Sequence, residues 1–339
     1  MSKSRGNDVD PADIAKRMGA EIVRLWVASV DFREDVVGSE NLMQRIAEVY
    51  RSLRNNLFKN CLGNLYDFDA TKAVPFDQMQ AIDQFMLRLT HALSVDVTRW
   101  YEEFAFHKIY QRVNHFCTVE LSAFYADIVK DRLYTYAPNS IGRRSAQTAF
   151  WRICEALARL LAPIVSFTCD EVWQHLSAIQ ARSESVHLAT FPIAADIFGS
   201  TSVAADDPGQ EQEWTALRNI RDQVLKALEE ARNQKQIGKS LEAQVKLTAS
   251  DPAFAVLERH KDELRYLFIV SQVKLERSVS GNGTGGLTVE VSKADGEKCE
   301  RCWNYSVHVG EDQQYPTVCE RCAPVLKELD AGGSASESD

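Results

Sequence analysis

The sequence contains no run of about 18 uncharged apolar residues, so no membrane-spanning helix is predicted. Its N-terminus is polar and lacks the apolar stretch of a secretory signal, and a cytoplasmic location is therefore expected. An excess of positive charge is also missing, since the formal net charge is −9. This excludes a protein that coats nucleic acid through its overall charge, although a local basic face is still possible.

A disulfide framework is not expected either, because the eight cysteines occur in a chain without an export signal. Cys61, Cys117, Cys154 and Cys169 are scattered among apolar residues and are expected to be small buried side chains. The length of 339 residues predicts two or three domains.

The other four cysteines form a cluster near the C-terminus. Cys299, Cys302, Cys319 and Cys322 have the spacing C-x2-C-x16-C-x2-C, which is typical of a zinc ribbon or knuckle. Four thiolates complete a tetrahedron, so the pattern predicts one structural zinc ion; free thiols or two disulfides are the alternatives. The segment between the pairs has too little apolar mass to fold alone, so the metal is expected to stabilise it.

Each C-E-R-C tetrapeptide places an arginine just before its second cysteine. We expect Arg301 and Arg321 to point away from the metal, beside Trp303, where they can bind phosphates and unpaired bases. The alternative is that Trp303 and Tyr305 cover the metal site.

The apolar pattern predicts a mainly α protein. Asp10 and Pro11 begin a helix that ends at Gly19, and helical spacing recurs through 39–180, which predicts a bundle of about five helices. Another amphipathic helix is expected over 211–236.

The segments outside these helices have patterns typical of extended chain, linkers and strands. Residues 186–192 are expected to be extended, and 194–209 has the composition of a linker. Short alternating stretches at 245–249, 269–275 and 287–291 predict a small sheet packed on helices.

One helical stretch carries a positive strip in this acidic chain. The strip has four basic residues and a single acidic one, Glu48. The basic residues are Arg45, Arg51, Arg54 and Lys59. The strip is either a solvated helix face or a surface for nucleic acid.

The N-terminal heptapeptide MSKSRGN has small hydroxyl residues around a lysine. Such a loop can close over phosphates during a phosphoryl or nucleotidyl step. The longer stretch MSKSRGNDVDPADIAKRMGAEIVRLWVAS resembles the signature-loop region of class I aminoacyl-tRNA synthetases. The segments YRSLRNNLFKNCLGNLYDFD and LSAFYADIVKDRLY resemble the helical anticodon-binding domain of the Ile/Val/Leu/Met branch. The stretch EARNQKQIGKSLEA and the CERCWNY…CERC module are similar to the C-terminal end of bacterial-type isoleucyl-tRNA synthetases, so the resemblance covers essentially all of 1–325.

The resemblance implies a part of an isoleucine–tRNA ligase, which activates isoleucine with ATP and magnesium and transfers it to tRNA(Ile). It implies that Lys3 stabilises the charge of the departing pyrophosphate and that Ser2 and Ser4 shape the loop around the ATP phosphates. A monomer is expected. The residues expected to contact tRNA are Arg51, Arg54, Lys59, Arg232, Lys235, Lys239, Arg301, Trp303 and Arg321.

The resemblance also implies a division of the chain. The expected segments are 1–38 (signature loop and connecting helices), 39–192 (anticodon-binding helical bundle), 193–295 (small α+β region), 296–325 (zinc finger) and 326–339 (disordered tail).

The sequence departs from the family in what it lacks. The first signature lysine is missing, and nothing corresponds to the His-Ile-Gly-His motif, its nucleotide-binding fold or the editing domain. We therefore expect the product of a truncated gene, inactive in isolation. The alternatives are a free-standing tRNA-binding module, a fragment of a valyl- or leucyl-tRNA synthetase, and a zinc-stabilised scaffold protein.

Overall fold

The computed structural model describes residues 10–34, 39–177, 182–199, 207–278 and 286–333. The chain divides into two compact units, one comprising 1–127 and 141–206 and the other comprising 128–140 and 207–339. The second unit thus takes a short segment from the middle of the chain. The expected mainly α fold is confirmed.

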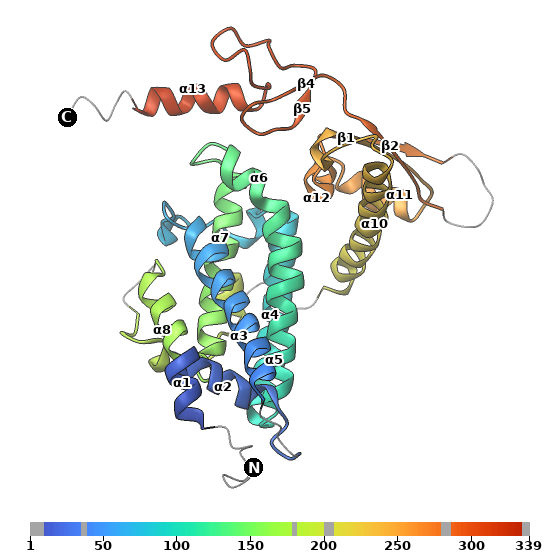
Figure 1. Ribbon diagram of the computed structural model, residues 1–339. Helices are drawn as coiled ribbons and strands as arrows, with labels where there is room; N and C mark the ends of the chain where they lie inside the picture. Colours follow the sequence, from blue (N-terminus) through green and yellow to red (C-terminus); the bar gives the residue numbers. More distant parts are fainter. Residues whose placement is uncertain (1–9, 35–38, 178–181, 200–206, 279–285, 334–339) are drawn as a thin grey trace. The chain divides into compact units, whose positions relative to one another are not determined.

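The first unit consists of helices. Its elements are α1 (Pro11–Met18), α2 (Ala20–Ser29), α3 (Glu40–Asn55), η2 (Asn56–Cys61), η3 (Leu62–Asn64), η4 (Ala70–Lys72), η5 (Phe76–Gln78), α4 (Ala81–Glu102), α5 (Phe106–His115), η6 (Phe116–Ala126), α7 (Ile141–Leu161), α8 (Ser166–His175), η7 (Val186–Leu188) and α9 (Ala194–Phe198). Helix α4 packs against α5 and α7, and α2 packs against α3 and α5 (Figure 1). The predicted start of the first helix is confirmed, since the Asp10 carboxylate accepts a hydrogen bond from the Ala12 N–H and Pro11 follows it.

Two helices of this unit wind as π-helices. Both η2 and η6 continue an α-helix without a break, and η6 leads directly into α6 (Asp127–Thr135). In η6, where each N–H bonds the carbonyl five residues earlier, the buried residues are Phe116, Cys117, Glu120, Leu121, Phe124 and Tyr125. The π-helix thus presents pairs of adjacent side chains to the core.

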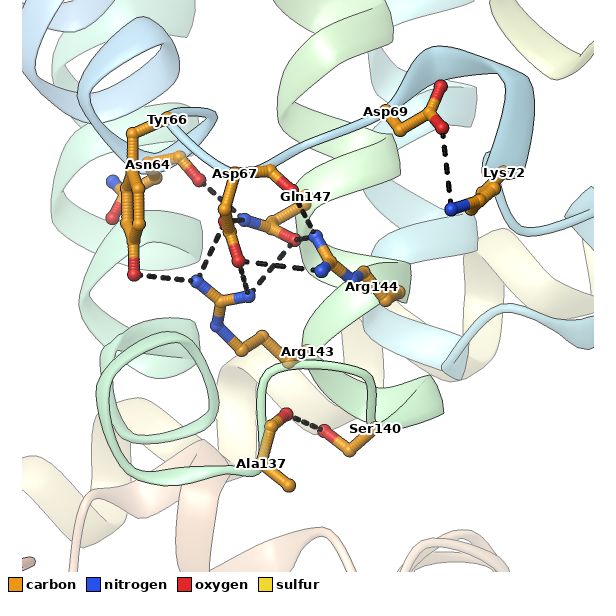
Figure 2. A network of polar contacts seen from close by, with 10 residues as sticks. All are labelled: Asn64, Tyr66, Asp67, Asp69, Lys72, Ala137, Ser140, Arg143, Arg144 and Gln147. Carbon is orange, nitrogen blue, oxygen red and sulfur yellow. Dashed lines mark hydrogen bonds and ion pairs between the residues drawn. The ribbon is translucent and has the colours of Figure 1, made fainter. Parts of the chain in front are cut away.

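A polar cluster fixes the loop that follows η2 and η3 (Figure 2). The Arg143 guanidinium at the start of α7 donates to both Asp67 carboxylate oxygens, at 2.7 and 3.0 Å, and to the Tyr66 hydroxyl at 3.2 Å. Gln147 donates to the Asn64 carbonyl and to Asp67, both at 2.8 Å. The first turns of α7 therefore hold the end of the helix that carries the positive strip.

The second unit combines α6 with a small sheet and more helices. Its other elements are α10 (Pro208–Asn233), η8 (Ser240–Glu242), β1 (Ala243–Ala249), α11 (Ala253–Arg259), α12 (Leu264–Phe268), β2 (Gln272–Arg277), β3 (Thr288–Lys293), β4 (Glu297–Lys298), β5 (Tyr305–Ser306) and α13 (Cys322–Gly333). The strand order is β2-β1-β3, with β1 parallel to β2 and antiparallel to β3. The predicted sheet and the predicted helix over 211–236 are both confirmed.

Three local expectations are wrong. Residues 186–188 form a 3₁₀ turn rather than extended chain, because the Ser185 hydroxyl accepts the His187 N–H. The expected linker contains α9, whose Ile197 and Phe198 are buried. The part of the expected disordered tail that the structure describes, 326–333, is helical, since Leu326 packs on the cysteine cluster and Lys327 pairs with Asp312. The expectation for 334–339 lies outside the described residues.

Within the described ranges, the helices are too short or too polar to cross a membrane.

Candidate metal centre and RNA-contact residues

The four clustered cysteines converge at one point of the second unit. The Sγ atoms of Cys299, Cys302, Cys319 and Cys322 all lie within 4.8 Å of one another, and those of Cys302 and Cys319 are 3.7 Å apart. A tetrahedral zinc site with Zn–S bonds of about 2.3 Å has S···S edges of about 3.8 Å. The spacing of the sulfurs therefore fits a four-thiolate zinc site.

The surroundings of the sulfurs also suit a metal. The Cys319 N–H points to the Cys299 sulfur at 3.3 Å, so the backbone donates toward a ligand. The four cysteines are buried with Val318 and Ala323, and Val309, Tyr315 and Leu326 pack around them. This apolar cover is small, and the four cysteines are not joined by disulfides. A zinc ion bound here would be enclosed, structural and a large contributor to the folding of the module.

Trp303 does not cover this centre. It is 59% exposed, and the Lys298 ammonium lies 5.6 Å from its ring centroid. Its backbone has a positive φ of 64°, which an L-residue adopts only at a cost. Tyr305, by contrast, is half-buried, and its N–H donates to the Ser271 hydroxyl at 2.7 Å. The structure thus presents one exposed aromatic ring with a cation beside it, a combination suited to stacking.

The two arginines of the C-E-R-C turns have partners inside the second unit. Arg301 donates to the Thr135 carbonyl and lies 3.6 Å from the Cys322 sulfur. Arg321 forms a two-point ion pair with Asp131. The expectation that these side chains point away to solvent is wrong, because α6 supplies acceptors for both guanidinium groups. Contact of either arginine with RNA stays a prediction.

Burial and ion pairing oppose each other at Arg321. Burial disfavours its charged form, but the hydrogen bonds with Asp131 outweigh this and raise the pKa of the guanidinium above its ordinary value. The Arg321 guanidinium is therefore charged at every physiological pH.

The positive strip lies on α3 and η2 in the first unit. Arg51 and Lys59 are exposed, whereas Arg54 is half-buried and stacks on the Phe58 ring, 4.4 Å from its centroid. Arg54 also approaches the Glu171 carboxylate at 3.5 Å, a neighbour that the sequence pattern could not identify. Arg45 on α3 is exposed as well, so Arg45, Arg51 and Lys59 are the accessible cations of this strip.

The predicted contact residues at the end of α10 and just after it are exposed. Arg232 lies in the last turn and pairs with Glu229 at 2.6 Å. Lys235 follows the end of the helix with φ 59°, a left-handed conformation usually taken by glycine. Lys239 lies four residues further on and is also exposed.

The signature-loop residues Ser2, Lys3 and Ser4 lie outside the residues that the structure describes. Their expected contact with ATP phosphates stays a prediction.

Several residues of the site were missed in the sequence. Asp131 binds Arg321 across 190 positions of the chain, and sequence spacing gives no signal for such a pair. Lys298 directly precedes Cys299, and its position next to a metal ligand was a sequence signal for a candidate contact residue. A polar cleft of about 210 Å³ also adjoins the cysteines, and its lining includes Arg265, Gln272, Asn304 and His308.

Three family models match the chain. Residues 83–247 match the anticodon-binding domain of tRNA ligase, and residues 296–325 match the zinc finger found in FPG and IleRS. Residues 1–39 match tRNA synthetases class I (I, L, M and V). These matches follow the order expected from the sequence motifs.

Curated relatives match along nearly the whole chain. Isoleucine–tRNA ligase from Syntrophotalea carbinolica is 45% identical over 332 residues, which are 96% of this chain and 35% of that protein. Isoleucine–tRNA ligase from Symbiobacterium thermophilum is also 45% identical, over 97% of this chain and 35% of that protein. The chain thus spans about a third of the length of the relatives it matches. A solved LeuRS–tRNA–LeuAMS complex from Agrobacterium radiobacter K84 is 21% identical over 58% of this chain and 22% of that chain, with a TM-score of 0.42.

Proposed function

This chain is a homologue of a C-terminal part of isoleucine–tRNA ligases, and from this premise we propose that it supplies the anticodon-binding part of such a ligase and binds tRNA(Ile). The observation that carries the proposal is the identity of 45% over nearly the whole chain. The match of 83–247 to an anticodon-binding domain supports tRNA as the partner. The match of 296–325 to a zinc finger named for IleRS favours isoleucine over valine or leucine.

Local backbone strain supports the choice of two contact residues. Lys235 and Trp303 are both exposed and both have positive φ angles, of 59° and 64°. Left-handed backbone costs an L-residue about 1–2 kcal/mol, and glycine would avoid this cost. Strained residues cluster at functional sites. We propose that the Lys235 ammonium contacts phosphate and that Trp303 stacks on an unpaired base.

The proposed phosphate contacts of the first unit are Arg51 and Lys59. Both are exposed cations on one continuous helix, whose far end the Arg143–Asp67 cluster holds in place. Arg54 has a smaller proposed role, because Glu171 and Phe58 already occupy its guanidinium group. A protein with a net charge of −9 then binds RNA through local cations.

We propose that Lys3 acts in the complete ligase, where it stabilises the charge on the pyrophosphate leaving ATP. The 339 residues include no His-Ile-Gly-His motif. The polypeptide purified by itself is therefore proposed not to form isoleucyl-adenylate. A monomeric state and a cytoplasmic location stay predictions of the sequence.

The test is direct binding of tRNA(Ile) transcript to the zinc-loaded chain, measured by fluorescence anisotropy from about 50 to 200 mM salt. We expect binding that weakens steeply with salt. The double variant Arg51→Ala/Lys59→Ala is expected to weaken binding and to reduce the salt slope by about 0.7–0.9 for each phosphate that is no longer neutralised.

The control for the removal of charge is Lys72→Ala, which eliminates an exposed cation elsewhere in the first unit. It is expected to leave the salt slope unchanged. Equal slopes for the wild type and the double variant would make the strip a solvated helix face. Failure of the wild-type chain to bind tRNA at low salt would reject the proposed function and favour a scaffold protein.

Isoleucine-dependent ATP–pyrophosphate exchange tests the statement about activity. We expect no exchange above background for the purified 339-residue chain. Exchange by this chain alone would contradict the proposal.

A further inference from the structure

Segment 128–140, which comprises nearly all of α6 and the turn before α7, contacts the metal module through the two C-E-R-C arginines. We propose that Arg301 and Arg321 are positioning residues that clamp this segment to the zinc centre. Metal binding and ordering of 128–140 then stabilise each other. The inference rests on the metal centre and does not depend on RNA binding.

Arg301 connects a metal ligand to the end of a helix. Its Nη1 atom lies 3.6 Å from the Cys322 sulfur and also donates to the carbonyl of Thr135, the last residue of α6. The last carbonyls of a helix have no partner within the helix, and they carry the negative end of its dipole. A single guanidinium nitrogen therefore lies beside two electron-rich groups.

Arg321 makes a second connection to the same helix face. Its Nη2 donates to Asp131 at 2.8 Å, and its Nη1 pairs with the other carboxylate oxygen. The Thr135 hydroxyl, one turn along α6, donates to the Asp131 carbonyl at 2.8 Å and approaches the carboxylate at 3.4 Å. Asp131 and Thr135 thus form one acceptor surface for both arginines.

Aromatic rings enclose the second connection. The guanidinium carbon of Arg321 lies 5.5 Å from the ring centroid of Tyr136 and 5.9 Å from that of Tyr266. The Tyr136 hydroxyl donates to the Tyr266 hydroxyl at 2.9 Å. Tyr136 belongs to the clamped segment, so this contact extends the interface beyond α6. Ion pairs shielded from water in this way are stronger than exposed ones.

The charges explain why the arginines sit next to metal ligands. A zinc ion with four thiolates carries a net charge of about −2, which the two guanidinium groups offset in part, since Arg321 is also paired with Asp131. Each arginine directly precedes a ligand, Cys302 or Cys322, so the metal fixes the backbone that carries it. Outer partners of metal ligands typically change metal affinity by about 10–100-fold. The coupling is reciprocal, because two binding events that help each other do so equally.

The decisive variant is Asp131→Ala, because Asp131 lies on α6 and acts on the centre through Arg321. We expect its zinc affinity, measured on the full chain by competition with a chromophoric chelator, to fall about tenfold. Asp222→Ala is the matched control, since it removes an exposed helical aspartate from α10 of the same unit. The control is expected to keep the wild-type affinity.

Arg321→Lys is the second variant, because lysine keeps the charge but loses the two-point geometry. It is expected to lower zinc affinity in the same direction. Wild-type zinc affinity in both Asp131→Ala and Arg321→Lys would overturn the proposal. A tenfold loss in the Asp222→Ala control would overturn it as well, because the effect would then be unspecific.

Hydrogen exchange tests the reciprocal direction. Removal of zinc by a chelator is expected to speed amide exchange in 128–140 about tenfold, while β1 and α10 keep their protection. Unchanged exchange in 128–140 after complete zinc removal would contradict the clamp. An equal loss of protection in α10 would also contradict it, since that would show general unfolding of the unit.

Discussion

Asp67 accepts hydrogen bonds from both terminal guanidinium nitrogens of Arg143, at 2.7 and 3.0 Å (Figure 2). The arginine side chain of this ion pair is only 4% exposed. Burial favours the neutral form of Asp67, but the hydrogen bonds from Arg143 and then Gln147 lower the pKa of its carboxyl below the ordinary value. The carboxylate therefore stays ionised and ties the loop after η3 to the start of α7.

Arg143→Met is expected to destabilise the first unit by about 3 kcal/mol, because it leaves a partly buried carboxylate without its main partner. The measurement is urea denaturation followed by the helical circular dichroism signal. Lys72→Met, which breaks the exposed 3.6 Å pair with Asp69, is the control and should cost less than about 1 kcal/mol. Similar losses of stability in the two variants would show that the Arg143 pair contributes no more than a surface pair.

Removal of zinc is expected to unfold residues 296–333 and to leave β1, β2 and β3 folded. The apolar cover of the cysteines is too small to hold the module without the metal. Metal analysis should give about one zinc per chain, and Cys302→Ser should abolish it. Cys117→Ser, at a buried cysteine of the first unit, is the control and should retain the zinc. A zinc-free wild-type chain with an ordered module would contradict this prediction.

The second unit is expected to become less stable as pH rises through the pKa of His260. Hydrogen bonds to Glu263 and Glu213, at 3.4 and 2.5 Å, raise this pKa above its ordinary value, although burial opposes them. A raised folded-state pKa gives stability that is complete below the unfolded pKa of about 6.5 and is lost above the folded pKa.

Denaturation between about pH 5.5 and 8.5 measures this dependence. His260→Gln is expected to flatten the pH profile of the second unit, because glutamine does not titrate. His175→Gln, at an exposed histidine of α8, should keep the wild-type profile. An unchanged profile in His260→Gln would reject the assignment.

Lys235→Gly is expected to stabilise the chain by about 1 kcal/mol and to weaken tRNA binding. Glycine adopts the positive φ of 59° without strain, but it removes the exposed ammonium. Thermal denaturation and anisotropy measure the two effects. The neighbour Gln234 has a negative φ of −79°, so Gln234→Gly should not stabilise. Stabilisation with unchanged tRNA affinity would remove Lys235 from the proposed contacts.

The sequence by itself determined the features that depend on local spacing. Cysteine pairs with two residues between them predict a tetrahedral site, and Asp10 with Pro11 predicts the start of a helix. The apolar periodicity similarly predicts the bundle and the helix α10, because each face must be buried in a fixed register. The order of motifs was sufficient for the resemblance to a synthetase.

Only the tertiary structure decided which charged groups are already paired. Arg54 meets Glu171, and Arg321 meets Asp131, through folding that brings together residues more than a hundred positions apart. The structure also decided that 128–140 joins the C-terminal unit and that Trp303 stays exposed. The physical reason is that an arginine needs an acceptor in three-dimensional space, and a one-dimensional pattern does not show which distant carboxylate or carbonyl will provide it.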